Sequence, residues 1–160
     1  MNNSGYGGVV TNVKFAGGYT AGDANWALPK DVFSRFKAAD MSVWLADSAA
    51  AGWTSWYVIL PDGAGRKTLI GSVGAGGPPD ESGAIMIGYS LRDQFHGKGY
   101  ATEALQGFLA WAGRHPGLRR VVANTYPHLT TSIRVLEKCG FGLVGAGLDE
   151  GTIRFELWCR

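Results

Sequence analysis

A glycine–lysine–glycine sequence at the expected start of a helix has the residue types best suited to bind an anion. Gly97 and Gly99 flank Lys98, and an apolar pattern with helical spacing follows, from about Gly99 to Gly113. A helix N-terminus exposes backbone N–H groups without an internal partner, and the helix dipole adds partial positive charge. Glycine leaves these groups open and permits a positive φ, while Lys98 adds a cation. The stretch therefore suits a diphosphate.

Two glycines at such a turn can also be purely structural. The pattern alone therefore does not decide between anion binding and a structural turn. The stretch lacks the Walker A spacing G-x-x-x-x-G-K-[ST] and the third glycine of the dinucleotide-binding fingerprint. A nucleotide-binding α/β domain is therefore a remote alternative. The glycines at 74–77 and 145–147 precede no helix and are expected in turns or bulges.

The elements that must position this stretch follow from the pattern of apolar residues. Strands are predicted over 53–60, 66–75, 84–91, 119–126, 141–147 and 152–159, and helices over 29–39, 99–113 and 131–139. This order predicts a mixed α/β sheet with a parallel crossover from strand 84–91 to strand 119–126. Strand 84–91 is apolar on both faces and is therefore expected to be central. Gly140 is expected to stop the last helix in a left-handed conformation, with Phe141 against Leu136.

Size and composition describe one globular domain over 1–160, with residues 1–25 as an irregular or poorly ordered entry. The chain has 160 residues, 46% apolar and 18% charged, which excludes a disordered chain. A net charge of +2 gives no support for nucleic acid or an anionic membrane as partner. Cys139 and Cys159 form neither a disulfide framework nor a metal pattern, so a cytoplasmic location and no metal are expected.

Taken together, these residues resemble the GNAT superfamily of acyl-CoA-dependent N-acetyltransferases. Residues 94–99 (QFHGKG) match its diphosphate motif Q/R-x-x-G-x-G/A and follow a strand. Residues 99–105 (GYATEAL) and 132–141 (SIRVLEKCGF) are similar to the RimJ/RimL-like branch, which acetylates N-termini of ribosomal proteins. The resemblance runs from about Trp53 to the C-terminus. It implies a mostly antiparallel central sheet with one parallel, splayed strand pair, flanked by helices.

The resemblance implies acetyl-CoA as co-substrate, bound along the strand and turn described above. The strand end at 89–91 would pair with the pantetheine amides, the turn at 94–101 would hold the diphosphate, and the thioester would lie between the splayed strands. The implied CoA-binding residues are Tyr89, Ser90, Leu91, Gln94, Phe95, His96, Gly97, Lys98, Gly99, Tyr100, Ala101, Leu129 and Ser132.

Acetyl transfer to an amine needs removal of an ammonium proton, stabilisation of an oxyanion, and a proton for the departing thiolate. The resemblance places Ser132, at the start of the last helix, near the sulfur as the candidate acid. His128 is the candidate base, with an unperturbed pKa of ~6.5. Each residue also has a structural reading, Ser132 as a residue that caps its helix and His128 as a loop residue after Pro127.

Three positions depart from the family's pattern. Met86 replaces a strand glutamate, Leu129 an asparagine that often holds pantetheine, and Leu136 a tyrosine acid. These replacements remove residues expected to transfer protons, but they do not affect a CoA site built from backbone groups. A non-catalytic acyl-CoA-binding module is therefore the alternative function. A site without a strong base favours an α-amine of pKa ~7.7–8.0 over a lysine of ~10.4.

The acceptor is expected to be a small-molecule or peptide amine. Asp149 and Glu150, on the last hairpin turn, have one reading as attractors of a cationic amine and another as solvated turn residues. A cluster of aromatic residues is expected in the core or in a dimer interface rather than in the acceptor pocket. Its members are Trp44, Trp53, Trp56 and Tyr57. Only the family resemblance suggests a homodimer.

Overall fold

The structure is a computed structural model that describes residues 11–14, 53, 56–61 and 67–159. The predicted helix over 29–39 and Trp44 lie outside these residues. The elements are β1 (Thr11–Lys14), β2 (Trp56–Pro61), β3 (Lys67–Ala75), β4 (Ala84–Leu91), the 3-10 helix η2 (Asp93–Phe95), α3 (Tyr100–Ala112), β5 (Arg120–Thr125), α4 (Thr130–Lys138), β6 (Gly142–Ala146) and β7 (Ile153–Trp158).

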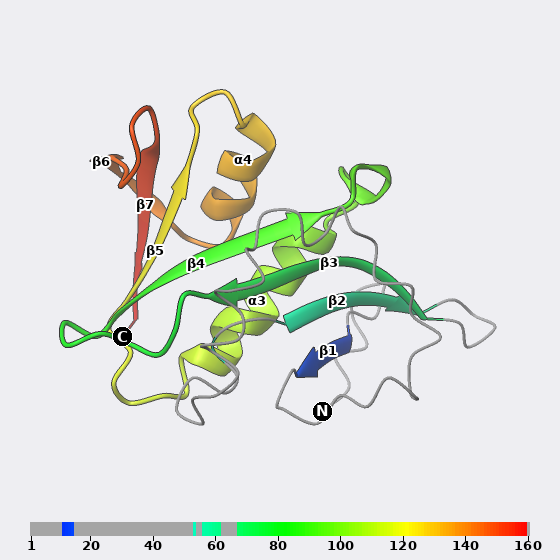
Figure 1. The fold of residues 1–160 in the computed structure, drawn as a ribbon, viewed down its shortest axis with the longest axis horizontal. Helices are drawn as coiled ribbons and strands as arrows, with labels where there is room; N and C mark the ends of the chain where they lie inside the picture. Colours follow the sequence, from blue (N-terminus) through cyan, green and yellow to red (C-terminus); the bar gives the residue numbers. More distant parts are fainter. Residues whose placement is uncertain (1–10, 15–52, 54–55, 62–66, 160) are drawn as a thin grey trace.

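The described strands form one seven-stranded sheet in the order β1-β2-β3-β4-β5-β7-β6 (Figure 1). β4 and β5 are parallel, and every other neighbouring pair is antiparallel. The predicted mixed sheet with one parallel pair is confirmed, as is the central position of β4. The parallel pair is joined through α3, because parallel neighbours need a long crossover connection.

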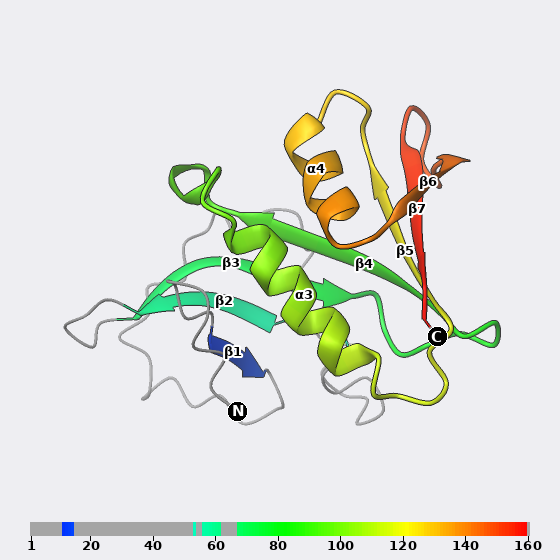
Figure 2. The same cartoon turned by 180° about the vertical axis from the view of Figure 1, so that it is seen from behind.

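The parallel pair separates at one end of the sheet. Its register runs from Ala84 opposite Arg120 to Ile87 opposite Ala123. Beyond that point β4 continues to Leu91 and pairs only with β3 among the described strands. β5 turns away, so a gap opens between the two strands beside the start of α3 (Figures 1 and 2). The predicted splay is therefore present.

The helices α3 and α4 cover one face of the sheet (Figure 2). Leu105 and Phe108 of α3 are completely buried, and they pack in one core with Ile85 and Ile87 of β4. Strand side chains alternate between faces, so Met86 points away from the helices and is 45% exposed. The described helices thus cover only one of the two apolar faces of β4. No described helix has the length and apolarity needed to cross a membrane.

The aromatic residues before and in β2 belong to the core. Trp53 and Trp56 are 4% and 8% exposed, and their rings lie 4.9 and 5.1 Å from that of Trp111 in α3. Tyr57 is buried as well. Trp53 and Trp56 hold the β2 end of the sheet to α3, which confirms the core reading over the acceptor pocket.

The chain enters the fold through a short edge strand. Thr11–Lys14 form β1, which pairs antiparallel with residues 56–59 of β2. The prediction of an irregular entry over residues 1–25 is therefore wrong for these four residues. Only Thr11 and Val13 carry β-branched side chains, so the local preference for a strand is weak. Pairing with the aromatic strand β2 stabilises the strand instead.

A left-handed glycine ends α4 as predicted. Gly140 has φ +88°, and its N–H donates to the carbonyl of Glu137 at 3.0 Å. The N–H of Phe141 donates to the carbonyl of Leu136 at 3.1 Å, which completes the expected pair of bonds. This stop directs the chain from α4 into β6.

We expect Gly140→Ala to lower the free energy of unfolding by about 1–2 kcal/mol, because a Cβ disfavours the left-handed conformation. The added methyl meets Leu157 at an ordinary 3.6 Å, so backbone strain dominates. The measurement is urea denaturation. Gly142→Ala, in β6 with open space around the new methyl, is the control and changes stability little. Equal stability of the two variants would contradict this explanation of the helix stop.

Candidate active site beside the parted strands

Two left-handed glycines shape the turn between β4 and α3. Gly97 has φ +73°, and Gly99, the N-cap residue of α3, has φ +85°. These are conformations that glycine adopts readily and other residues rarely do, so the conformational reason predicted for the glycines is confirmed. A Cβ at either position would meet nothing within 4 Å, so the space outside the turn is open. The turn can therefore be approached closely by a ligand.

The backbone N–H groups around this turn have no protein acceptor in the described part of the chain. The N–H of His96 donates to the carbonyl of Asp93 at 3.0 Å, and the N–H of Glu103 donates to that of Gly99 at 3.0 Å. Between them, the N–H groups of residues 97–102 have no acceptor among the described residues. The Lys98 ammonium lies over the Phe95 ring, 5.7 Å from its centroid. The turn thus combines open donors with a nearby cation, as an anion site requires.

The end of β4 beside this turn is open on one edge. Tyr89, Ser90 and Leu91 pair with β3, and the edge that faces β5 has no ladder partner in the described sheet. The carbonyl of Leu91 is occupied, because the His96 ring Nε2 lies 2.9 Å from it. A carbonyl only accepts, so Nε2 carries the hydrogen and donates it. His96 therefore ties the turn to the strand end.

A tyrosine hydroxyl bridges β4 and α4 across the gap. The Tyr89 hydroxyl lies 3.0 Å from both the Ser132 carbonyl, to which it donates, and the Ser132 hydroxyl. Burial raises the pKa of Tyr89 above its ordinary value, so the phenol stays protonated at neutral pH. The sequence predicted only a backbone role for Tyr89. Its alternation with Ile85 and Ile87 is the signal that places its side chain on the helix face, toward Ser132.

The other candidates near α4 lie in the loop that precedes it. His128 is exposed, and its ring stacks on that of Tyr126 at 5.5 Å between centroids. Leu129 occupies the N-cap position of α4 and is 40% exposed. No hydrogen bond within the described chain joins His128 to Ser132. The geometry therefore brings Ser132 together with Tyr89, while the base role of His128 stays a prediction.

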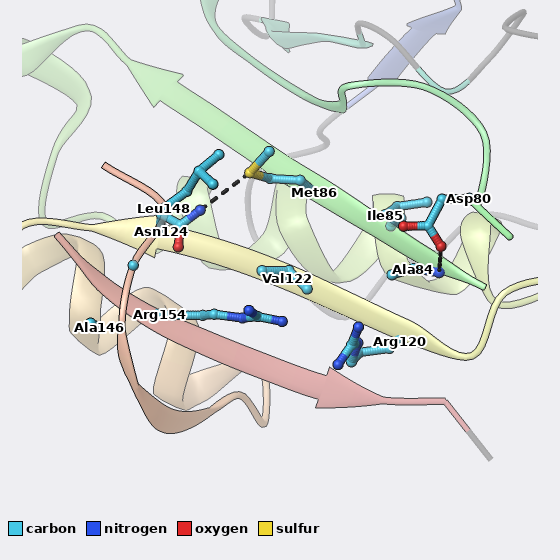
Figure 3. Close-up of a pocket in the computed structure, with 11 residues that line it drawn as sticks. Asp80, Ala84, Ile85, Met86, Arg120, Val122, Asn124, Ala146, Leu148 and Arg154 are labelled. Carbon is cyan, nitrogen blue, oxygen red and sulfur yellow. Dashed lines mark hydrogen bonds between the residues drawn. The ribbon is translucent and has the colours of Figure 1, made fainter. Parts of the chain in front are cut away.

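A pocket of about 350 Å³ lies on the sheet face opposite α3 and α4 (Figure 3). β4, β5, β7 and the β6–β7 hairpin contribute most of its lining. The lining residues are Asp80, Ala84, Ile85, Met86, Arg120, Val122, Asn124, Ala146, Gly147, Leu148 and Arg154. At the end nearest the gap, Asn124 Nδ2 donates to Met86 Sδ at 3.2 Å. A thioether thus stands at the strand position where the sequence resemblance leads one to expect a carboxylate.

Charged side chains continue along the β5 and β7 side of the pocket. Arg120 and Arg154 both donate to Glu156 Oε1, the first over 3.3 Å. The Glu156 side chain is 9% exposed, against 26% and 35% for the two arginines. Two guanidinium groups therefore share one buried carboxylate.

One more carboxylate lies at the end of the pocket farthest from the gap. The Asp80 carboxylate accepts bonds from the hydroxyl and N–H of Ser82 and the N–H of Ala84. The Ser82 hydroxyl and the Ala84 N–H are the main reasons why its pKa lies below the usual value. Asp80 is therefore a weak base, and its role is to hold the loop before β4 rather than to abstract a proton.

The sequence profile of the acetyltransferase (GNAT) domain family matches residues 14–142. The chain belongs to this family. The match begins well before Trp53, so the limit that the sequence analysis set for the resemblance is wrong on the N-terminal side. The predicted GNAT family and fold class are confirmed, whereas the RimJ/RimL-like branch stays a prediction.

Similar proteins agree with this assignment. YjdG of Bacillus subtilis strain 168, named an uncharacterized N-acetyltransferase, is 32% identical over 95 residues, which are 59% of this chain and 55% of that protein. The chain thus spans about half the length of that relative. A GNAT acetyltransferase from Bacillus anthracis shares the fold with a TM-score of 0.57 and 24% identity over 81% of this chain and 82% of its own. RimL, a ribosomal L7/L12 α-N-protein acetyltransferase solved with coenzyme A, shares the fold with a TM-score of 0.53. It is 19% identical, and the match covers 66% of this chain and 62% of RimL.

The remaining candidates of this GNAT domain lie away from the Tyr89–Ser132 pair. Asp149 and Glu150 are exposed on the β6–β7 hairpin and do not line the pocket, to which the hairpin contributes Leu148 instead. Their role toward an amine stays a prediction. Within the described residues, no group of three or more potential ligands is placed to hold a metal.

Proposed function

We propose that this GNAT domain transfers an acetyl group from acetyl-CoA to a primary amine, by direct attack in a ternary complex. The observation that carries the proposal is the set of open N–H groups at 97–102, which begins α3 beside the gap between β4 and β5. A diphosphate on these groups places the rest of the carrier along the open edge of β4. The extended pantetheine amides can then pair with residues 88–90 as a further strand would.

The thioester then lies in the gap, within reach of Ser132. The Tyr89 hydroxyl donates its single hydrogen to the Ser132 carbonyl, so the Ser132 hydroxyl donates to the Tyr89 oxygen and can turn that hydrogen toward the departing sulfur. Ser132 is therefore the proton donor to the thiolate, and Tyr89 positions it.

We expect Ser132→Ala to lower kcat about 10- to 100-fold, with little change in the KM for acetyl-CoA. General acid catalysis contributes about 10²–10⁴-fold, and a thiol of pKa ~8.5 leaves readily, so the lower end applies. Tyr89→Phe should lower kcat less than Ser132→Ala does. In the double variant it should add little further loss, since Tyr89 acts through the serine. Steady-state kinetics measures both variants. Thr131→Ala, an exposed neighbour on the same helix, is the control, and an equal loss there would refute the assignment.

Direct attack agrees with the state of the two cysteines, both of which are free. Burial raises the pKa of Cys139 to about 11 and raises that of Cys159 as well. A thiol with a raised pKa is mostly protonated at neutral pH and is a poor nucleophile. These cysteines therefore do not suit an acyl-enzyme intermediate, which a ping-pong reaction would need.

The acceptor is best explained as an amine of low pKa. The described lining of the pocket offers Met86 near the gap and only the weak base Asp80 at the far end. An α-amine needs less help than a lysine side chain, because more of it is neutral at pH 7. The motif resemblance to the RimJ/RimL-like branch points the same way. The proposal keeps the cytoplasmic location predicted from cysteine usage.

The test is release of free CoA from acetyl-CoA with a panel of peptide and small-molecule amines. We expect release that depends on the amine, together with a thermal shift by CoA and not by ATP or NAD. The second candidate function, a non-catalytic acyl-CoA-binding module, is favoured by Met86, which occupies a position where a base is expected. A thermal shift by CoA with no turnover on any amine would establish that module and reject the enzyme.

A further inference from the structure

We propose that the pocket beside the gap selects acceptor amines that also carry an anionic group, which Arg154 binds. This inference rests on the proposed function, because the amine must reach a thioester held between β4 and β5. The chemistry recognised is a carboxylate or a phosphate close to the amine, as in a peptide with an acidic second residue.

The position of the pocket explains how an acceptor would approach. The parallel pairing ends at Ile87 and Ala123, and Met86 and Asn124 line the pocket at that end (Figure 3). The Tyr89 hydroxyl lies on the opposite, helix-covered face, because strand side chains alternate. The amine therefore attacks from the pocket face, while the thiolate is protonated on the helix face.

Asn124 has an unpartnered amide oxygen at this end of the pocket, on the side of the β6–β7 hairpin. Its Nδ2 is occupied by Met86 Sδ at 3.2 Å, whereas its Oδ1 is buried and has no partner among the described residues. A buried carbonyl oxygen without a donor costs free energy, so a ligand N–H there is favoured.

Arg154 provides a partly exposed positive charge for the anion. It lies directly opposite Asn124 across the β5–β7 pair, and its Nε is buried and without a partner among the described residues. Its Nη2 donates to Glu156, which also binds Arg120, so one carboxylate serves two guanidinium groups. The remaining positive charge at Arg154 favours an anion.

The far end of the pocket is better balanced. Asp80 lies at the Arg120 end of the pocket (Figure 3), so that arginine has a second carboxylate near it. Asn124 and Arg154 are opposed across the β5–β7 pair, and the Arg154 side chain extends from there toward Arg120 (Figure 3), so the anion of the acceptor belongs about one side-chain length from its amine. A side-chain carboxylate or phosphate on the second residue of a peptide meets that requirement.

The experiment measures kcat/KM at saturating acetyl-CoA for two matched pairs of dipeptide amides. Ala-Asp amide is compared with Ala-Asn amide, and Ala-phosphoserine amide with Ala-Ser amide. We expect the charged member to be preferred about tenfold in at least one pair, and the pair with the larger ratio identifies carboxylate or phosphate as the anion. Arg154→Gln should bring the ratio near one. Glu156→Gln should raise it, because it removes the competing charge.

Arg114→Gln is the control, since Arg114 is exposed and lies outside the pocket lining, and it should keep the wild-type ratio. A wild-type ratio near one in both pairs, or a ratio that survives Arg154→Gln, would overturn the inference. Failure of the proposed function has a different result, namely no transfer to any of the four peptides. In that case calorimetric binding of the peptides in the presence of CoA still decides anion selection, with the same expected ratios.

Discussion

Gly97→Glu is expected to weaken acetyl-CoA binding at least about 100-fold. The new carboxylate would stand among the N–H groups that face the diphosphate and would repel it. Loss of two charge-assisted hydrogen bonds at about 1.5 kcal/mol or more each removes about 3 kcal/mol, and every 1.4 kcal/mol is tenfold. Isothermal titration calorimetry with acetyl-CoA measures the effect directly.

Two matched variants separate charge from backbone strain. Gly117→Glu adds the same charge at an exposed glycine with open space and no positive φ, beyond the other end of α3, and should bind as wild type. Gly97→Ala adds strain at φ +73° without charge, so it should lower stability more than affinity. Unchanged affinity in a folded Gly97→Glu protein would contradict the diphosphate site.

Acetylation of an α-amine is expected to exceed that of a lysine side chain at least about 100-fold at pH 7. About a tenth of an α-amine of pKa ~7.7–8.0 is neutral there, against less than about a thousandth of a lysine of pKa ~10.4. The rate on the α-amine should rise with pH and level off near its pKa, whereas the rate on lysine should keep rising about tenfold per pH unit. The measurement is kcat/KM across pH 6–9.

The matched substrates are one lysine-containing peptide in two forms, one with a blocked side chain and a free N-terminus, the other the reverse. A preference for lysine, or a rate that does not follow the amine's ionisation, would show that the protein supplies a strong base. His128→Gln then tests the predicted candidate, since loss of a real base would lower the rate most below the amine's pKa.

Much of the fold could be predicted from local pattern. The ends of α3 and α4 carry glycines that fix them, and β4 was predicted with its observed bounds. Thr11–Lys14 could not be predicted as a strand, because their pairing depends on β2, which is distant in sequence. The sequence likewise does not reveal which face of β4 the helices cover, because both faces are apolar.

The candidate site was predictable where backbone conformation carries it and less so where side chains meet. Gly97 and Gly99 are local signals, and their positive φ values follow from the motif. The Tyr89–Ser132 contact joins residues far apart in sequence, so it appears only when β4 and α4 are packed together. The cluster of Arg154 and Glu156 with Arg120 likewise depends on the β5–β7 register, which sequence patterns alone do not provide.

The most direct measurement is an NMR titration of the ¹⁵N-labelled protein with acetyl-CoA, following the backbone amides of residues 97–102. We expect these amides to show the largest shifts in the spectrum and to saturate together, with S-acetylpantetheine, which has no diphosphate, leaving them nearly unmoved. Tight binding of acetyl-CoA that leaves these amides in place, or no binding at all, would show that the start of α3 does not hold the carrier.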